Sequence, residues 1–170
     1  DPETRQHLSG IVDRLGRAGA TVEELTLPDS FDTAVEDQRT IMRVEAASFH
    51  QPMYERQAQD YHPNLREILR RGLETDGVSY SRALERRRQF ITDMELLAEK
   101  ADVLLTPSTP TPALAELTNT GNTIFQGPWT SCGLPAITVP SGLAESGLPF
   151  GIQLIAAPFQ EPRLLAAARW

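Results

Sequence analysis

The chain has 170 residues, 40% of them hydrophobic and 23% charged, which is enough to form one domain with a real core. Its net charge of −7 argues against binding along a nucleic-acid backbone, because that interaction needs clustered cations. No apolar run reaches the roughly 18 residues of a membrane span, and the single cysteine, Cys132, rules out an internal disulfide and favours the reducing cytoplasm.

The first hundred residues are predicted to be mainly helical. Asp1 is a suitable N-cap, and Pro2 suits the first position of a helix. Apolar residues then recur at helical spacing, and proline and glycine mark the breaks. The predicted elements are a helix from Asp1 to about Gly19, a strand over 21–27, a helix from Phe31 to about Phe49, a short helix over 63–73, and a long helix over 80–100 capped by Ser79.

The remaining residues predict short apolar strands separated by loops rich in proline, threonine and serine. Strands are expected over 102–106, 137–139 and 151–156, with a short helical turn within 124–130 and a final helix over 161–170. Helices that alternate with short apolar strands predict an α/β fold, and no linker divides the chain, so we expect one domain over 1–170.

Two blocks near the end carry the most information. One is the run PWTSCGLPAITVPSG at 128–142, and the other is GLPFGIQLIA at 147–156. Together with DVLLTP at 102–107 and AGATV at 18–22, they resemble the C-terminal portion of the amidase-signature family, which hydrolyses carboxamides with a Ser-Ser-Lys triad. The resemblance implies the C-terminal portion of that fold, a mixed β-sheet with strands flanked by helices.

The residues that perform the family's reaction are missing from this sequence. It contains no Gly/Ser-rich segment with the two serines, and its one lysine, Lys100, lies where it would complement the C-terminal end of a helix. The resemblance therefore implies a partial domain without the N-terminal catalytic portion. We expect no catalytic residue here, no metal, no cofactor, and no amidase activity from these residues alone. The uncovered strand edges predict self-association.

The resemblance also implies a wall of the pocket for a small-molecule amide substrate, just before the Gly-Leu-Pro motif. The wall residues would be Thr123, Gln126, Gly127, Trp129 and Thr130, although for Trp129 ordinary core packing is the favoured interpretation. The glutamine-hydrolysing subunits of tRNA-dependent amidotransferases are similar but have an acidic residue at the position of Thr123. An uncharged wall favours a general amidase with a less polar substrate.

Other candidate sites are weaker. His7, His50 and His62 show no metal-ligand spacing, and Cys132 has no neighbouring base, so it is predicted to be a small buried residue rather than a nucleophile. A second hypothesis remains open, in which the chain is a non-catalytic domain that binds a ligand or a partner subunit.

Overall fold

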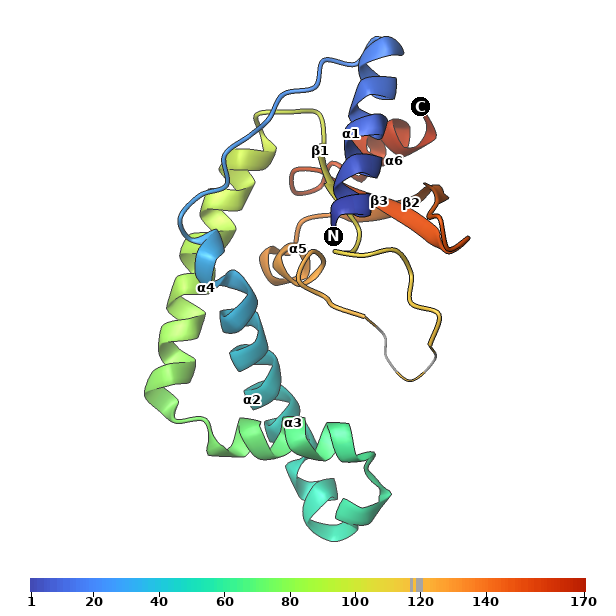
Figure 1. Ribbon diagram of the computed structural model, residues 1–170. Coiled ribbons are helices and arrows are strands. Elements are labelled where there is room, and N and C mark those ends of the chain that lie inside the picture. Colours follow the sequence, from blue (N-terminus) through green and yellow to red (C-terminus); the bar gives the residue numbers. More distant parts are fainter. Residues whose placement is uncertain (117, 119–120) are drawn as a thin grey trace. The chain divides into compact units, whose positions relative to one another are not determined.

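The structure is a computed structural model, and it describes residues 1–116, 118 and 121–170. These residues form two compact units (Figure 1). The first unit contains residues 1–28 and 92–170, and the second contains residues 29–91. The α/β class is confirmed, because helices in the first unit accompany a three-stranded sheet.

The sheet of the first unit has the order β1-β3-β2, and both strand pairs are antiparallel. Its strands are β1 (Leu104–Pro107), β2 (Ala136–Leu143) and β3 (Pro149–Ile155). β2 is longer than predicted, because it continues through Pro140 instead of ending there. β2 lies at an edge of this sheet, and a register shift follows Pro140, which are the two settings in which a strand tolerates proline.

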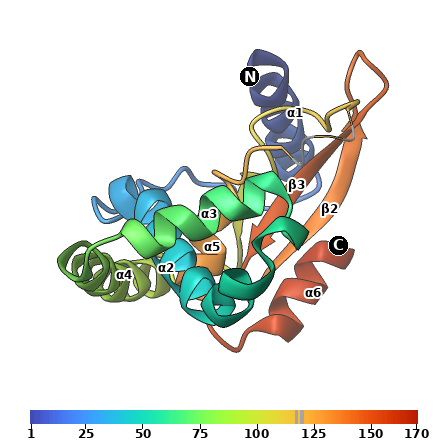
Figure 2. The same ribbon diagram turned by 90° about the horizontal axis from the view of Figure 1, so that it is seen from below.

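Helix α6 (Glu161–Arg169) covers the apolar face of this sheet and lies along β2 and β3 (Figure 2). Leu164 of α6 is buried against Leu154 of β3, and Leu105 and Ile137 pack around them. The prediction for this helix was correct to within one residue.

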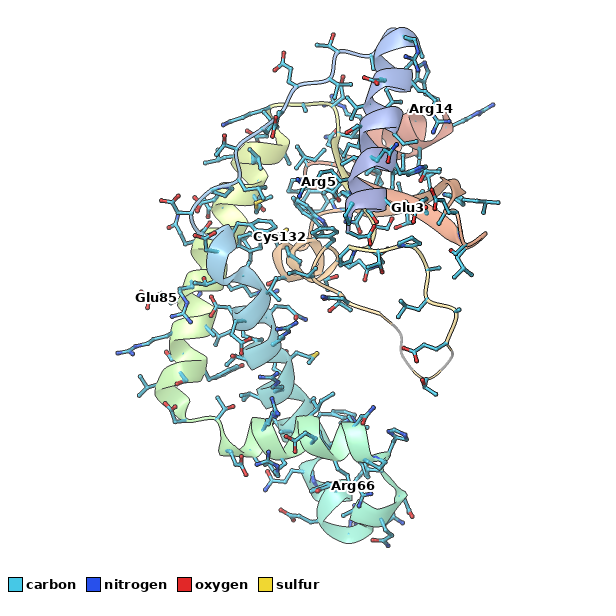
Figure 3. All side chains as sticks on the ribbon, in the orientation of Figure 1. Glu3, Arg5, Arg14, Arg66, Glu85 and Cys132 are labelled. Atoms are coloured by element: carbon cyan, nitrogen blue, oxygen red, sulfur yellow. The ribbon has the colours of Figure 1, made fainter. Side chains whose placement is uncertain are left out.

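Helix α1 (Pro2–Arg17) is held against the β2–β3 hairpin. The Asp1 carboxylate accepts hydrogen bonds from the backbone N–H groups of Glu3 and Thr4, at 2.8 and 3.2 Å, which confirms the predicted cap. His7 stacks on Phe150 with ring centroids 4.3 Å apart. The Glu3 carboxylate, labelled in Figure 3, accepts the backbone N–H of Glu145 at 2.8 Å.

The predicted strand over 21–27 is wrong, because residues 20–28 form no helix or strand. Val22 and Leu27 remain 42% and 46% exposed. A β-branched sequence becomes a strand only when a neighbouring strand satisfies its backbone, and among the described strands none pairs with this segment.

The second unit contains α2 (Phe31–Gln57), a 3₁₀ turn η1 (Ala58–Asp60), α3 (Pro63–Glu74) and most of α4 (Gly77–Ala98). α2 continues past its predicted end near Phe49 and includes Pro52. α2 also packs against α3. α4 begins before the predicted cap Ser79, because Asp76 is the residue whose carboxylate accepts the Ser79 N–H, at 2.9 Å.

Candidate functional site

The sheet of the first unit has one polar face. Thr106 of β1 and Thr138 of β2 both face Gln153 of β3 in the strand register. Ser108, directly after β1, donates its backbone N–H to Gly151 O at 3.0 Å and so extends the same row. Side chains alternate between the faces of a strand, so the apolar residues under α6 and these polar residues lie on opposite faces.

Gly151 lets two of these polar side chains approach each other. A Cβ at position 151 would lie 2.8 Å from Ser108 Oγ and 3.1 Å from Thr138 Cγ2. The buried Ser108 hydroxyl donates to Thr138 Oγ1 at 3.4 Å, which is long for an O–H···O bond. Both hydroxyls therefore keep hydrogen-bonding capacity for a bound molecule.

A hollow of about 460 Å³ opens on this face. Its walls come from residues between 108 and 114, from residues between 121 and 126, and from β2 and β3. None of the described lining residues is charged. They include Ser108, Thr109, Leu114, Asn122, Gln126, Thr138, Phe150 and Gly151. A neutral wall of hydroxyl, amide and apolar groups suits an uncharged polar ligand better than an ion.

The five predicted wall residues lie in one short segment before and within α5 (Gly127–Cys132). The carbonyl of Thr123 accepts the N–H groups of Gln126 and Gly127, at 3.0 and 2.8 Å, and so forms the turn that begins α5. The helical turn predicted within 124–130 therefore occurs slightly later in the chain.

Of these five, Gln126 lines the hollow, and the others have different surroundings. Thr123 and Thr130 are exposed, Gly127 is half-buried, and Trp129 is only 4% exposed. Ser108, Thr138 and Gly151 complete the hollow from the sheet, and no local pattern in the sequence marks them.

Gln153 is another residue of this region that sequence reasoning missed. Its side chain is buried, and its Nε2 donates to Phe125 O at 3.0 Å and to Thr106 Oγ1 at 3.4 Å. A polar amide inside an otherwise apolar strand is the available sequence signal, since buried amides need partners.

The remaining candidates do not form a second site. Cys132, labelled in Figure 3, is buried and its thiol contacts Trp129 O at 3.4 Å, as expected for a small packed residue. His7 contacts Ser141 Oγ at 2.9 Å, His50 contacts Tyr61 Oη at 3.0 Å, and His62 caps α3.

Within the described ranges, no group of three or more His, Cys, Asp or Glu residues could hold a metal ion. No helix in those ranges is long and apolar enough to cross a membrane.

The described residues form an α/β arrangement that carries the sequence motifs of 102–107, 128–142 and 147–156. Residues 1–165 match the family model described as Amidase, and the chain belongs to that family.

Relatives and solved structures agree with this assignment. The chain is 32% identical over 199 residues to the A subunit of the glutamyl-tRNA(Gln) amidotransferase of Geotalea daltonii, covering 99% of this chain and 41% of that protein. It is 42% identical over 95 residues to the corresponding protein of Zymomonas mobilis, covering 52% of this chain and 19% of that protein. A solved amidase structure superimposes with a TM-score of 0.91 at 25% identity, over 99% of this chain and 41% of the other. The chain thus spans at most about two fifths of these proteins.

Proposed function

We propose that residues 1–170 are a single, partial domain that forms the C-terminal part of a cytoplasmic amidase. The observation that carries the proposal is the family match over residues 1–165 in a sequence whose one lysine, Lys100, lies just beyond the end of α4 at Ala98. The reaction cleaves the C–N bond of a carboxamide with water and gives a carboxylate plus ammonia or an amine.

In this proposal the catalytic Ser-Ser-Lys set belongs to a preceding part of the protein. Its nucleophilic serine attacks the amide carbonyl, the second serine and the lysine transfer the proton to the leaving nitrogen, and backbone N–H groups stabilise the oxyanion. The residues described here contribute sheet strands and the wall segment, which we define as residues Thr123–Thr130. No metal or organic cofactor is needed.

The substrate is proposed to be a small uncharged amide. The α-amino and α-carboxylate groups of glutamine need charged partners, whereas the wall segment and the described lining of the hollow carry none.

An amidotransferase A subunit is the second candidate, because both relatives named above are so named, and the resemblance implies that such a subunit hydrolyses glutamine. Ammonia release from glutamine and from aliphatic and aromatic amides, measured on the full-length protein, separates the two. Preference for glutamine would contradict the general amidase, and preference for an uncharged amide would contradict the amidotransferase.

The third candidate is a non-catalytic domain that binds a ligand or a partner protein. The coding sequence directly upstream decides this, since a Gly-Ser-Ser-Gly-Gly-Ser-like segment there supports the enzyme and a start codon near Asp1 supports the binding domain.

The 170-residue chain alone is expected to release no ammonia and to self-associate at micromolar concentration. Turnover that survives stringent purification, or a monomer in sedimentation, would contradict those two expectations respectively.

A further inference from the structure

Gln153 lies in β3, the central strand of the three-stranded sheet. Its strand β3 is hydrogen-bonded to β1 on one side and to β2 on the other. The side chain is only 4% exposed, which is unusual for glutamine and requires hydrogen-bond partners.

The principal partner of Gln153 is a backbone carbonyl of the wall segment. Gln153 Nε2 donates to Phe125 O at 3.0 Å across 28 residues of sequence. The second contact, with Thr106 Oγ1, is weaker at 3.4 Å. Phe125 lies between Thr123, whose carbonyl forms the turn before α5, and Gln126, which lines the hollow.

We propose that Gln153 is a positioning residue that fixes the wall segment on the polar face of the sheet, and so sets the fit of the substrate. The part that concerns substrate rests on the proposed function of this segment. The physical reason is that residues 121–126 form no helix or strand beyond a single turn, so the segment has no strand partner and the Gln153 amide ties it to the central strand of the sheet.

The chemistry of the amide explains why a neutral donor is required at position 153. Phe125 O can only accept a hydrogen bond, and an ionised carboxylate in place of the amide could only accept as well. Gln153→Glu therefore keeps the size and shape of the side chain, removes the donor, and places two acceptors against each other.

Hydrogen exchange of the 170-residue chain tests this directly. Gln153→Glu should lower the protection of the Gln126 and Gly127 amides about tenfold, the factor equivalent to losing one hydrogen bond of about 1.4 kcal/mol. The matched control is Gln160→Glu, the same change at an exposed residue of the same unit, which should leave both amides unchanged. Unchanged protection in Gln153→Glu would overturn the proposal.

Acidification supplies a rescue that a merely structural defect would not show. When the introduced carboxyl group is protonated it regains an O–H donor, so protection corrected for intrinsic exchange should return at low pH. If Gln153→Glu fails to fold, the unmodified chain still decides, because the Gln153 side-chain amide protons must show nuclear Overhauser contacts to Phe125. Their absence would overturn the proposal.

Kinetics of the full-length protein test the part that concerns substrate. Gln153→Glu should raise KM for an amide about tenfold and change kcat less than about twofold, as expected when binding is lost equally from ground and transition states. An unchanged KM would overturn the role in substrate fit. If the unmodified full-length protein hydrolyses no amide, the proposed function fails, whereas exchange still decides whether Gln153 fixes the segment.

Discussion

The carboxylate of Asp37 in α2 and the guanidinium of Arg86 in α4 form a two-pronged ion pair across 49 residues of sequence. Arg86 Nε lies 3.1 and 2.9 Å from the two oxygens of Asp37, and Nη2 also donates to Oδ1. Asp37 is buried while the Arg86 side chain is 48% exposed. The hydrogen bonds to Asp37 raise the pKa of Arg86, so the guanidinium stays charged.

Arg86→Ala should destabilise the second unit by about 3 kcal/mol, because it leaves the buried Asp37 carboxylate without its cationic partner. Chemical denaturation of the chain measures this. Arg82→Ala, an exposed arginine on the same helix, is the control and should cost less than about 0.5 kcal/mol. The double substitution Asp37→Asn with Arg86→Ala should be clearly less costly than the sum of the single changes. Strict additivity would show that the pair contributes nothing.

The sequence correctly predicted the helices that begin with capping residues or proline. The Asp1-Pro2 start of α1 and the Pro162 near the start of α6 are examples, and both helices agree with the sequence. The errors occur where distant contacts decide. Residues 21–27 have strand propensity without a strand partner, Pro52 lies within α2, and Pro140 lies within an edge strand.

The residues of the candidate site also divide into those that a local motif indicates and those that only distant contacts bring together. The Gly-Leu-Pro motif led to the prediction of wall residues between Thr123 and Thr130, and of the five predicted residues Gln126 lines the hollow. Ser108, Thr138 and Gln153 reach the same region only through strand register, and the bond between Gln153 and Phe125 joins residues 28 apart. No periodicity in one sequence specifies which strands become neighbours, so these residues could not be assigned before the fold was known.

Glu67 in α3 is expected to titrate far below an ordinary glutamate. Hydrogen bonds from Arg70 and Arg71, at 2.7 to 2.9 Å, lower its pKa from 4.5 to about 2. Because the folded pKa is depressed, the stabilisation is fully present above pH 4.5 and is lost as pH falls toward 2. Carboxyl chemical shifts followed by NMR measure this. Added salt should raise the pKa toward 4.5, since the group is exposed and screened. A midpoint near 4.5 at low salt would contradict the prediction.

Gly72 in α3 should not tolerate alanine, although alanine favours helices. A Cβ at this position would overlap the backbone carbonyl of Arg43 and lie 2.7 Å from Ala47 Cβ in α2. Gly72→Ala should therefore destabilise the chain by about 1–3 kcal/mol. Gly10→Ala in α1 is the matched control, because its Cβ would meet nothing within 4 Å, and it should stabilise by about 0.5–1 kcal/mol. Equal effects of the two changes would show that α2 and α3 are not this close.

Thr123 and Trp129 should separate substrate preference from stability. Trp129→Ala empties a buried aromatic site and should cost about 3–5 kcal/mol of unfolding free energy. Thr123→Val changes an exposed residue and should cost less than about 0.5 kcal/mol, while it alters the ratio of kcat/KM between a small aliphatic and a bulky aromatic amide in the full-length protein. If Thr123→Val leaves that ratio unchanged, Thr123 is not part of the wall.

Gly133 ends α5, and the chain then continues through Leu134 and Pro135 into β2. Its φ is +74°, and its N–H donates to Trp129 O at 3.0 Å. A Cβ there would meet nothing within 4 Å, so any cost of substitution comes from the backbone alone. Gly133→Val should lower stability by about 2 kcal/mol or more, because a β-branched residue resists the left-handed conformation.

Gly133→Asn tests that reasoning, because asparagine adopts positive φ far more readily than valine while also adding a side chain. It should recover at least half of the stability lost in Gly133→Val, as measured by thermal unfolding of the two variants beside the unmodified chain. Equal losses would mean that space around position 133, and not its φ, selects glycine. If Gly133→Val is as stable as the unmodified chain, the left-handed conformation at position 133 does not select glycine.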